Sequence, residues 1–288
     1  MKGTGTQHNP YIIESFYDLL CINGGQDTYY TLGTDIDAND TPYSSGWTPI
    51  DLNCSYFDGA NHTIRNIIIN NTSLSEVKSV FRLSDTQSTA ISRLNFENLY
   101  INGGKSTVFS GVNSYPVYLS EMNFSFTATL GITSASGFSL LTAGTKNSFM
   151  ENSTINCTIS TIAITPIFRG DITNCHIKEN ITFTSNPSSE NLITSTNLMN
   201  TAVFANIISR NSSSSIRPAA KLANCYFVMP EMQNISTFNT TNNISGCCFY
   251  DADVAPDTVK FDTMYALSSE NCKNPEHLKS IGFLTEGE

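Results

Sequence analysis

Short runs of alternating apolar and polar residues fill most of the middle of the chain. In "LNFENLYI", Leu94 and Phe96 alternate with Asn95 and Glu97. A period of two places successive side chains on opposite faces, which is typical of a strand with one buried face and not of a helix. The pattern therefore predicts many short strands.

These strands recur along the chain. A phenylalanine precedes an Asn-bearing strand six times, as in "STINCTI", "ITNCHI" and "LANCYFV". Self-similarity at this period indicates a solenoid, in which each unit buries its face only against its neighbours. The phenylalanines are Phe57, Phe81, Phe109, Phe138, Phe168 and Phe204, which are separated by 24, 28, 29, 30 and 36 residues.

The repeat favours one class of solenoid. A helical repeat needs two amphipathic helices rich in Ala, Leu and Glu, which are scarce here, and a leucine-rich repeat needs Leu at fixed offsets. A parallel β-helix accommodates two or three short strands per coil and turns of variable length, which explains the uneven interval. We therefore expect an all-β, right-handed parallel β-helix, with a hydrogen-bonded ladder of Asn side chains along the stack and Phe81, Phe109, Phe138 and Phe168 inside.

The stretch "YFDGANHTIRNIII" (56–69) has two interpretations. Asp58, Asn61 and His62 form a reactive cluster in the first. In the second, Asp58 and Gly59 make a turn, Asn61 satisfies local backbone groups, and three isoleucines form a buried wall. The repeat favours the second interpretation, which places Ile64, Ile67 and Ile69 mostly inside.

Composition agrees with an all-β fold. The chain has 288 residues, of which 40% are hydrophobic and 14% are charged, whereas average proteins carry about 25% charged residues. Asn, Ser and Thr replace the missing charge. These residues favour strands and turns, whereas the outer face of a surface helix usually carries Lys and Glu. The chain is too apolar for disorder.

The charge distribution excludes one class of partner and favours another. A net charge of −10 without a basic stripe argues against nucleic-acid binding. Between residues 106 and 168 the charged residues are Glu121, Lys146 and Glu151. Such a neutral wall is able to meet copies of itself, so we expect a homo-oligomer with closed symmetry.

Eight cysteines occur without a C-x-x-C pair, which argues against a zinc or redox motif. Cys157, Cys175 and Cys225 each follow an Asn, so we expect buried, reduced thiols in a stack. The start "MKGTGTQHNPYII" has no apolar signal region, and no stretch approaches the ~18 apolar residues of a membrane span. We expect synthesis in a cytoplasm, without insertion into a membrane.

Both ends resemble one family. "GTGTQHNPYIIES" (3–15), "YYTLGTDID" (29–37), "GWTPI" (46–50) and "DGANHTI" (58–64) resemble the opening segments of GLUG-type β-helix proteins, and "NPEHLKSIGFL" (274–284) resembles their closing segment. The resemblance implies an N-terminal cap and first coil over 1–54, coils over 55–250 and a closing segment over 251–288. We expect a short helix in the cap at "DLLCI" (18–22).

The resemblance also implies a setting. Proteins of this family occur on bacterial surfaces and among phage tail and fibre proteins, and such phage fibres are often three-fold, so the resemblance favours a trimer. With no signal region, the phage setting is favoured: a virion structural protein of the fibre, tail or head-fibre type that attaches to a host-surface glycan or protein and is fixed to other virion proteins. A bacterial surface adhesin and a polysaccharide depolymerase are the alternatives.

One segment is similar to a calcium loop. "DIDAND" (35–40) begins as an EF-hand loop does, but it has Asp40 where Gly is required and Gly46 where a bidentate Glu is required. We therefore interpret Asp35 and Asp37 as structural residues at the end of a strand and in a turn. A weak calcium site on Asp35, Asp37 and Asp40 is the alternative.

No catalytic, cofactor or metal residue is assigned from the sequence. A lyase or glycosidase needs two carboxylates on one face. Adjacent coils bring Glu97 and Glu121 together in the enzyme alternative. Of the histidines, His62 reads as a turn residue and His176 as a strand side chain. Finally, Tyr29, Tyr30 and Tyr100 are candidates for a sugar-binding shelf.

Overall fold

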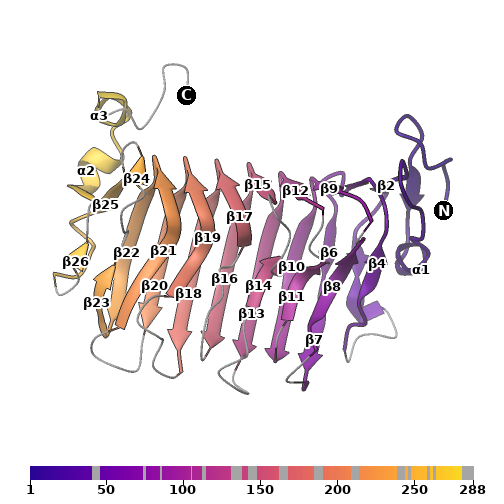
Figure 1. Cartoon of the computed structure of the whole chain (residues 1–288), viewed down its shortest axis with the longest axis horizontal. Helices are drawn as coiled ribbons and strands as arrows, with labels where there is room; N and C mark the ends of the chain where they lie inside the picture. Colours follow the sequence, from indigo (N-terminus) through magenta and orange to yellow (C-terminus); the bar gives the residue numbers. More distant parts are fainter. Residues whose placement is uncertain are drawn as a thin grey trace.

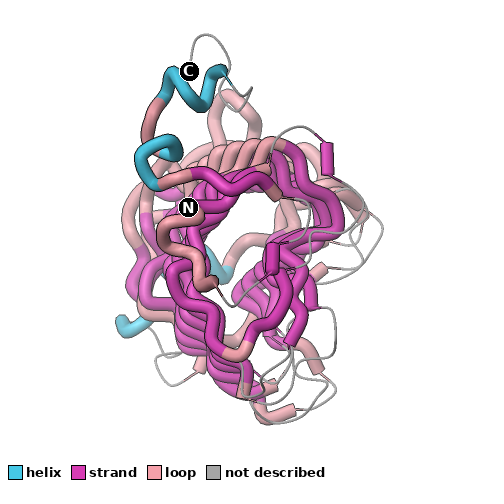
Figure 2. Tube along the Cα trace, turned by 90° about the vertical axis from the view of Figure 1, so that its left-hand side faces the viewer, coloured by secondary structure: helices cyan, strands magenta, loops and turns pink. Residues whose placement is uncertain are grey.

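A computed structural model of the chain shows a stack of parallel β-coils (Figure 1). Figure 2 looks along the stack, where successive coils lie over one another around a common interior. The structure describes residues 1–40, 46–73, 76–84, 86–104, 106–111, 115–130, 138–141, 148–161, 168–184, 191–208, 214–238, 244–245, 248–257, 260–261 and 264–280.

The described strands form three sheets along the stack, and their pairings are parallel. Sheet 1 contains β1 (Tyr11–Ile13), β2 (Tyr29–Leu32), β5 (Tyr56–Asp58), β9 (Thr89–Ser92), β12 (Val117–Ser120), β15 (Phe149–Glu151), β17 (Phe168–Thr173), β19 (Asn191–Met199), β21 (Ser214–Ala223), β23 (Ile235–Phe238), β24 (Ile244–Ser245) and β26 (Lys260–Phe261).

Sheets 2 and 3 complete the coils. Sheet 2 contains β3 (Ile36–Asp37), β6 (Thr63–Arg65), β7 (Ile68–Asn71), β10 (Asn95–Gly103), β13 (Asn123–Leu130), β16 (Thr154–Thr161), β18 (His176–Phe183), β20 (Ala202–Ile208), β22 (Tyr226–Gln233), β25 (Phe249–Asp251) and β27 (Tyr265–Leu267). Sheet 3 contains β4 (Ile50–Leu52), β8 (Lys78–Leu83), β11 (Ser106–Ser110) and β14 (Phe138–Leu141).

Coil length changes where sheet 3 ends. Thr89 pairs with Val117, 28 residues later, and Tyr118 pairs with Phe149, 31 residues later. Beyond β14, Phe149 pairs with Asp171 after only 22 residues, because each coil now contributes strands to sheets 1 and 2 alone within the described residues. The expected solenoid of two or three strands per coil is confirmed, and the uneven repeat has this structural cause.

The phenylalanine series does not form one column, which corrects the simple repeat. Phe57 and Phe168 lie in sheet 1, Phe81 and Phe109 in sheet 3, and Phe204 in sheet 2. Phe57, Phe81, Phe109 and Phe168 are buried as expected. Phe138 lies in β14, but its side chain is outside the described residues, and Phe204 is half-buried because its neighbour Val203 points inward instead.

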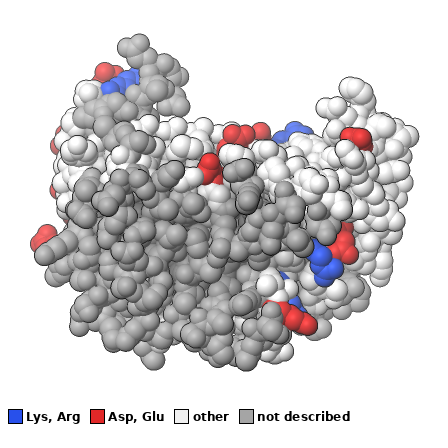
Figure 3. Space-filling model, in the orientation of Figure 1, with Lys and Arg blue, Asp and Glu red and all other residues white. Residues whose placement is uncertain are grey.

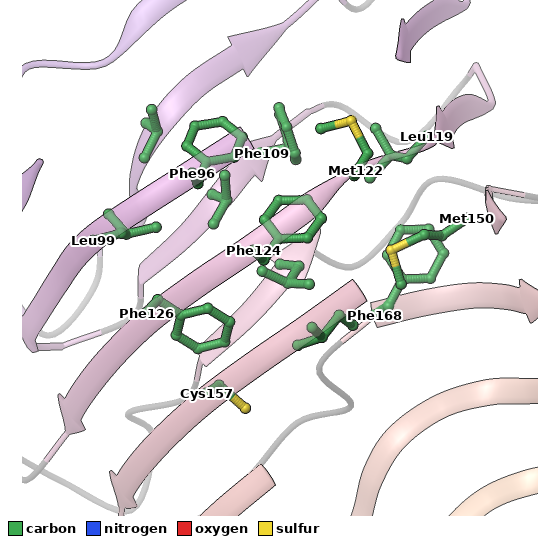
Figure 4. Close-up of a cluster of buried hydrophobic side chains, with 14 of the residues drawn as sticks. Phe96, Leu99, Phe109, Leu119, Met122, Phe124, Phe126, Met150, Cys157 and Phe168 are labelled. Carbon is green, nitrogen blue, oxygen red and sulfur yellow. The ribbon is translucent and has the colours of Figure 1, made fainter. Parts of the chain in front are cut away.

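Aromatic rings fill the first half of the interior. Phe81 stacks on Phe109 at 5.9 Å, and Phe96 stacks on Phe124 at 5.5 Å. The two stacks meet edge to face, with the rings of Phe96 and Phe109 centred 6.0 Å apart. Figure 4 shows this core continuing through Met122 and Leu119 toward Met150 and Phe168. Columns of mostly aliphatic side chains fill the later coils, such as Ile155, Ile177 and Val203, which are followed by Phe227.

The corner between sheets 1 and 2 repeats one backbone conformation. A residue with positive φ stands there in coil after coil, and its N–H donates to a carbonyl of the next coil, as in Arg93 to Ser120 at 3.0 Å. Asn is enriched because its short polar side chain tolerates the left-handed region. The corner residues are Arg93, Glu121, Asn152, Asn174, Asn200 and Asn224.

The stretch 56–69 is the first such corner. Ala60 and Asn61 have φ of 49° and 65°, and a Cβ on Gly59 would lie 2.3 Å from the carbonyl oxygen of Arg93. The structural interpretation of this stretch is confirmed for its wall, since Ile64, Ile67 and Ile69 are fully buried.

Asn ladders form, but as short pairs on outer positions instead of one buried row. Asn123 donates to Asn95 at 2.7 Å, and similar pairs join neighbouring coils elsewhere. The other pairs are Asn98 with Asn66, Asn102 with Asn70, Asn206 with Asn180, and Asn224 with Asn200.

The cysteines following Asn are buried and unpaired. Cys175 and Cys225 come directly after corner residues, where their thiols donate to the carbonyls of Thr173 and Ala223. Ser153 and Thr201 occupy the same place in other coils and donate alike, to Glu151 and Met199. Burial raises the pKa of the Cys175 thiol to about 11. Cys157 does not follow a corner residue but lies within β16.

Short helices lie at both ends. Helix α1 (Phe16–Leu20) begins at Ser15, which accepts a hydrogen bond from the Asp18 N–H at 3.1 Å, and lies two residues before the expected 18–22. Phe16 packs on Trp47, with ring centres 5.4 Å apart. The 3-10 helix is Ala38–Asp40, and α2 (Ser269–Cys272) and α3 (Pro275–Ser280) follow the last strand (Figure 1). Among the described residues no helix reaches the length and apolarity of a membrane span.

Loss of one ring from the interdigitated stacks is expected to weaken the whole stack. Phe109→Ala should lower the free energy of unfolding by about 3–5 kcal/mol, because it opens a cavity beside Phe81, Phe96 and Phe124. Chemical denaturation measures the loss. Tyr100→Ala, which removes a ring that is 48% exposed, is the matched control and should cost less than about 1 kcal/mol. Equal losses would contradict the assigned core.

Candidate outer-face site

A column of aromatic side chains runs along the outer face of sheet 1. Parallel register places Tyr29 beside Tyr56, then Ala90, then Tyr118, then Phe149, in successive coils. The residue that follows each of these aromatics in the strand, such as Phe57 after Tyr56 and Leu119 after Tyr118, points into the core. The alternation of a strand therefore brings aromatics from separate coils onto one line. We call Tyr29, Tyr56, Tyr118 and Phe149 the aromatic column.

The column divides into two pairs around Ala90. Tyr29 and Tyr56 have ring centres 6.2 Å apart and tilted by 47°. Tyr118 and Phe149 are stacked, with centres 5.5 Å apart and an angle of 7°. Tyr118 is 44% exposed and Phe149 37% exposed. These two rings are therefore stacked on each other and partly open to solvent.

A pocket of about 290 Å³ adjoins the first pair. Residues of the N-terminal loop, of β2 and of β5 line it together. This combination of apolar walls with a few convergent polar groups is the usual character of a ligand site. Its lining residues are Gln7, Pro10, Tyr29, Tyr30, Thr31, Tyr56 and Asp58.

The carboxylate in this pocket is held by two neighbours. Arg93 donates to Asp58 through Nε at 3.0 Å and through a second guanidinium nitrogen. The backbone N–H of Ala60 also donates to Asp58, at 2.9 Å. The hydrogen bond and charge of Asp58 raise the pKa of Arg93. The pair is therefore fixed in place and electrically neutral.

The tyrosines expected to form a shelf do not lie together. Tyr30 is 1% exposed, and its hydroxyl accepts a hydrogen bond from the Gly24 N–H at 3.1 Å. Tyr100 is exposed, but on β10 of sheet 2. Tyr29 alone belongs to the aromatic column. Tyr30 was misplaced because strand alternation turns it toward the core.

The aspartates of the calcium-like loop join neighbouring coils. Asp35 accepts from the Thr63 N–H at 3.0 Å and contacts His62 Nδ1 at 3.1 Å. Asp37 accepts from Asn66 and from Arg65 Nε, at 2.8 and 2.9 Å. These hydrogen bonds, led by those of Thr63 and Asn66, lower the pKa of Asp35 and Asp37. The side chain of Asp40 is outside the described residues, which contain no metal-binding cluster of three or more groups.

The two glutamates of the enzyme alternative occupy different places. Glu97 lies within β10, in register with Arg65 of β6. Glu121 lies at a corner, with φ of 54°, where its N–H donates to the carbonyl of Glu151. Since Asn95 pairs with Asn123, the two glutamates are displaced to opposite sides of that pair. Stacking of coils does not bring them together.

The histidines are scattered. His62 lies at the first corner beside Asp35. His176 is exposed at the start of β18, in register with Thr154 and Ala202. His8 is in the exposed N-terminal loop and His277 in α3. These positions agree with turn and strand roles for His62 and His176.

A buried carboxyl, Glu179, was not identified from the sequence as an inward position. It is fully buried in β18, in register with Cys157 and Ala205, and neither oxygen has a hydrogen-bond partner among the described residues. Burial raises the pKa of Glu179 to about 8. The signal was present in "HIKENITF", where Glu179 falls in phase with Ile177, Ile181 and Phe183.

Charged side chains on the described surface are sparse and scattered (Figure 3). Most of the ion pairs, such as Arg82 with Asp51 at 3.0 Å, join one coil to the next, whereas the pairs of Met1 with Asp18 and of Lys2 with Glu14 lie within the N-terminal segment. The outer faces therefore present hydroxyl, amide and aromatic groups more than charge.

Known proteins share the fold or part of the sequence. No family model matches the chain. Halomucin from Haloquadratum walsbyi (strain DSM 16790 / HBSQ001) is 33% identical over 121 residues, which is 39% of this chain and 1% of that protein. A crystal structure described as a "putative immunoglobulin A1 protease" from Bacteroides ovatus matches 96% of this chain and 89% of its own, with a TM-score of 0.51 and 17% identity. The structural match shows a shared fold.

Ionisation of Glu179 is expected to make stability depend on pH. The unfolded chain loses this proton from about pH 4.5 and the folded chain only from about pH 8. Unfolding therefore becomes easier as pH rises across that window, by an amount on the order of 3–5 kcal/mol. Glu179→Gln should remove this decline and be more stable than the parent at pH 8.

Denaturation midpoints between pH 4 and 9 measure this difference. Glu231→Gln, which changes an exposed glutamate of the same sheet, is the matched control and should follow the parent. Parallel curves for the parent and Glu179→Gln would show that Glu179 ionises freely in the folded protein.

Proposed function

We propose that this protein is an attachment module displayed on the outside of a particle or cell, most specifically a fibre or tail component of a virion. The observation that carries the proposal is the aromatic column, which presents Tyr118 and Phe149 as a stacked, exposed pair on the outer face of sheet 1. Aromatic residues are enriched where proteins recognise partners, because they supply large contact area at low entropic cost. A rigid stack holds the column in line without help from loops.

Several observations support the surface setting. Part of the chain is similar to a protein named Halomucin, a name that fits a surface setting, and the fold is shared with a protein described as a "putative immunoglobulin A1 protease". The segments that resemble GLUG-type proteins extend this setting to phage tails and fibres. A bacterial surface adhesin is the alternative setting for the same binding face.

The proposal includes how the stack ends. A parallel stack has unpaired backbone at each end, so each end needs a cap or a partner. We place residues 1–54 as the N-terminal cap and first coil, 55–250 as right-handed coils, and 251–288 as the closing segment. Packing of Phe16 against Trp47 supports the first assignment, and α2 and α3 support the last.

Binding to whole cells tests attachment. Fluorescently labelled protein should bind saturably to some members of a panel of gut bacteria that includes Bacteroides ovatus. The double variant Tyr118→Ala/Phe149→Ala should bind at least about tenfold more weakly, since loss of two interface aromatics costs about 1–2 kcal/mol each or more. Flow cytometry measures the affinity. Tyr100→Ala, on sheet 2, is the matched control.

Two results would count against the proposal. Equal binding by the parent and the double variant would remove the aromatic column from the site. Release of reducing or unsaturated sugar ends from the cells, lost in Glu97→Gln or Glu121→Gln, would instead establish the depolymerase alternative. Antibody labelling of purified particles and of cells distinguishes the virion from the adhesin setting.

The fibre setting also includes self-association. We expect a homo-oligomer, with a trimer of three times the 31.5 kDa chain favoured, because a neutral outer wall favours closed contact between copies and the phage fibres that the chain resembles are often three-fold. Light scattering after size exclusion measures the mass. A stable monomer at micromolar concentration is the opposing result.

A further inference from the structure

We infer that the pocket beside the aromatic column binds the end of a neutral glycan, with one pyranose unit between the N-terminal loop and the first tyrosine pair. This inference rests on the proposed attachment function, because it names the chemical class that the module would hold. It assigns a separate site, since the pocket is lined by Tyr29 and Tyr56 and not by Tyr118 or Phe149.

The pocket has walls suited to a pyranose face. Tyr29 and Tyr56 present two rings inclined by 47°, and Pro10 also lines the pocket. One face of a pyranose carries several C–H groups, whose slight positive charge is attracted to the negative face of an aromatic ring. A pocket of about 290 Å³ is near the small end of ligand sites. Its size fits a single sugar ring and not a folded peptide segment.

The polar groups of the pocket match hydroxyls. A sugar hydroxyl both donates and accepts, so it is best met by a mixture of donors and acceptors. Asp58 supplies acceptor oxygens, Gln7 supplies an amide with both functions, and Thr31 supplies a hydroxyl. The bonds from Arg93 and Ala60 fix Asp58 before any ligand arrives, which lowers the entropic cost of binding.

The charge of the site disfavours ionic ligands. The chain has a net charge of −10, which repels acidic polysaccharides. Arg93 neutralises the carboxylate of Asp58, so the pocket lacks the unopposed negative charge that attracts a cation. A quaternary ammonium group is best held by a cage of aromatic faces, but the Tyr30 ring is turned into the core. A neutral polyhydroxyl ligand remains the best match.

The N-terminal loop is built to form the pocket wall. The Tyr29 N–H donates to the Gly5 carbonyl at 2.9 Å, and the Thr4 N–H donates to the Asn9 carbonyl at 3.0 Å. Gly5 has φ of 75°, and a Cβ there would lie 2.3 Å from the Tyr11 ring. The loop is therefore held against β2 by a backbone bond, and its residues Gln7 and Pro10 line the pocket together with the tyrosines.

The rest of a glycan has a path along the same face. Successive coils are spaced by about 4.8 Å, which is close to the length of one pyranose in an extended chain. From Tyr56 the column passes Ala90, whose small side chain leaves room above the sheet, and then reaches Tyr118. A chain that ends in the pocket therefore meets the stacked pair of the attachment face.

Saturation-transfer NMR with simple glycosides tests the pocket in the full-length protein. The probes are the methyl glycosides of glucose, galactose, mannose and N-acetylglucosamine, with methyl glucuronide and choline as charged comparisons. We expect at least one neutral glycoside to bind. Tyr56→Ala should weaken it about tenfold or more, which is about 1.4 kcal/mol, because the ring that contacts the sugar is lost, whereas Tyr56→Phe should retain most of the affinity.

Controls separate this site from the fold and from attachment. Tyr100→Ala should bind the glycoside as the parent does, and circular dichroism and the denaturation midpoint confirm that each variant is folded. If Tyr56→Ala does not fold, Gln7→Ala is used as the pocket variant instead. It removes an amide that lines the pocket and should weaken glycoside binding severalfold.

The inference is overturned if no neutral glycoside binds, if only glucuronide or choline binds, or if the pocket variants bind as the parent does. Cell binding that persists in the parent and is lost in Tyr118→Ala/Phe149→Ala would then leave the attachment function intact. If no neutral glycoside binds and the parent also does not bind cells, both the glycan site and the attachment function are contradicted.

Discussion

The parallel ladder between coils is the constraint on which the rest of this structure depends. Each strand pairs with the equivalent strand of the next coil, so every inward position meets its own equivalent, as Ile155 meets Ile177 and then Val203. Interiors are packed without voids, so a side chain in one coil sets the space left for the next. This explains why the core reads as columns, with Phe96 stacked on Phe124 and Phe81 on Phe109.

The same constraint moves all irregularity to places between the strands. Coils vary in length, and sheet 3 ends at β14 among the described strands, yet the ladders of sheets 1 and 2 continue. The corner residues carry this continuity, because a left-handed residue such as Asn174 turns the chain and still donates its N–H to the next coil. The small residue after the corner, Cys175 or Thr201, satisfies a nearby carbonyl. Turning and pairing are thus achieved by two residues.

A ladder that aligns the inside also aligns the outside. Tyr118 and Phe149 are stacked because their coils are in register, and the same register brings Tyr29 to Tyr56. Residues of the N-terminal loop line a pocket beside Tyr29 and Tyr56, whereas Tyr118 and Phe149 are exposed to solvent. One face therefore offers an enclosed site and an extended one. Glu179 shows the converse, since the register that fills the core also carries a carboxyl into it.

The sequence by itself determined the strands, the solenoid and the buried wall at Ile64, Ile67 and Ile69, because alternation and recurrence are properties of neighbouring residues. It also held the inward phase of Glu179, which lies in step with Ile177 and Ile181. Only the tertiary structure decided which coils lie side by side. The unevenly spaced phenylalanines from Phe57 to Phe204 lie in three different sheets, which the sequence did not show. Residues between strands change the sequence separation of two phenylalanines without changing how the strands pair.

The aromatic column and its pocket belong to this second group. Tyr56, Tyr118 and Phe149 are far apart in sequence and follow no common motif, so their alignment depends on coil lengths that the pattern of residues left open. Tyr29 and Tyr30 are neighbours in sequence, but strand alternation sends one outward and the other into the core. Local pattern fixes which residues form strands, and the register between coils fixes which side chains meet.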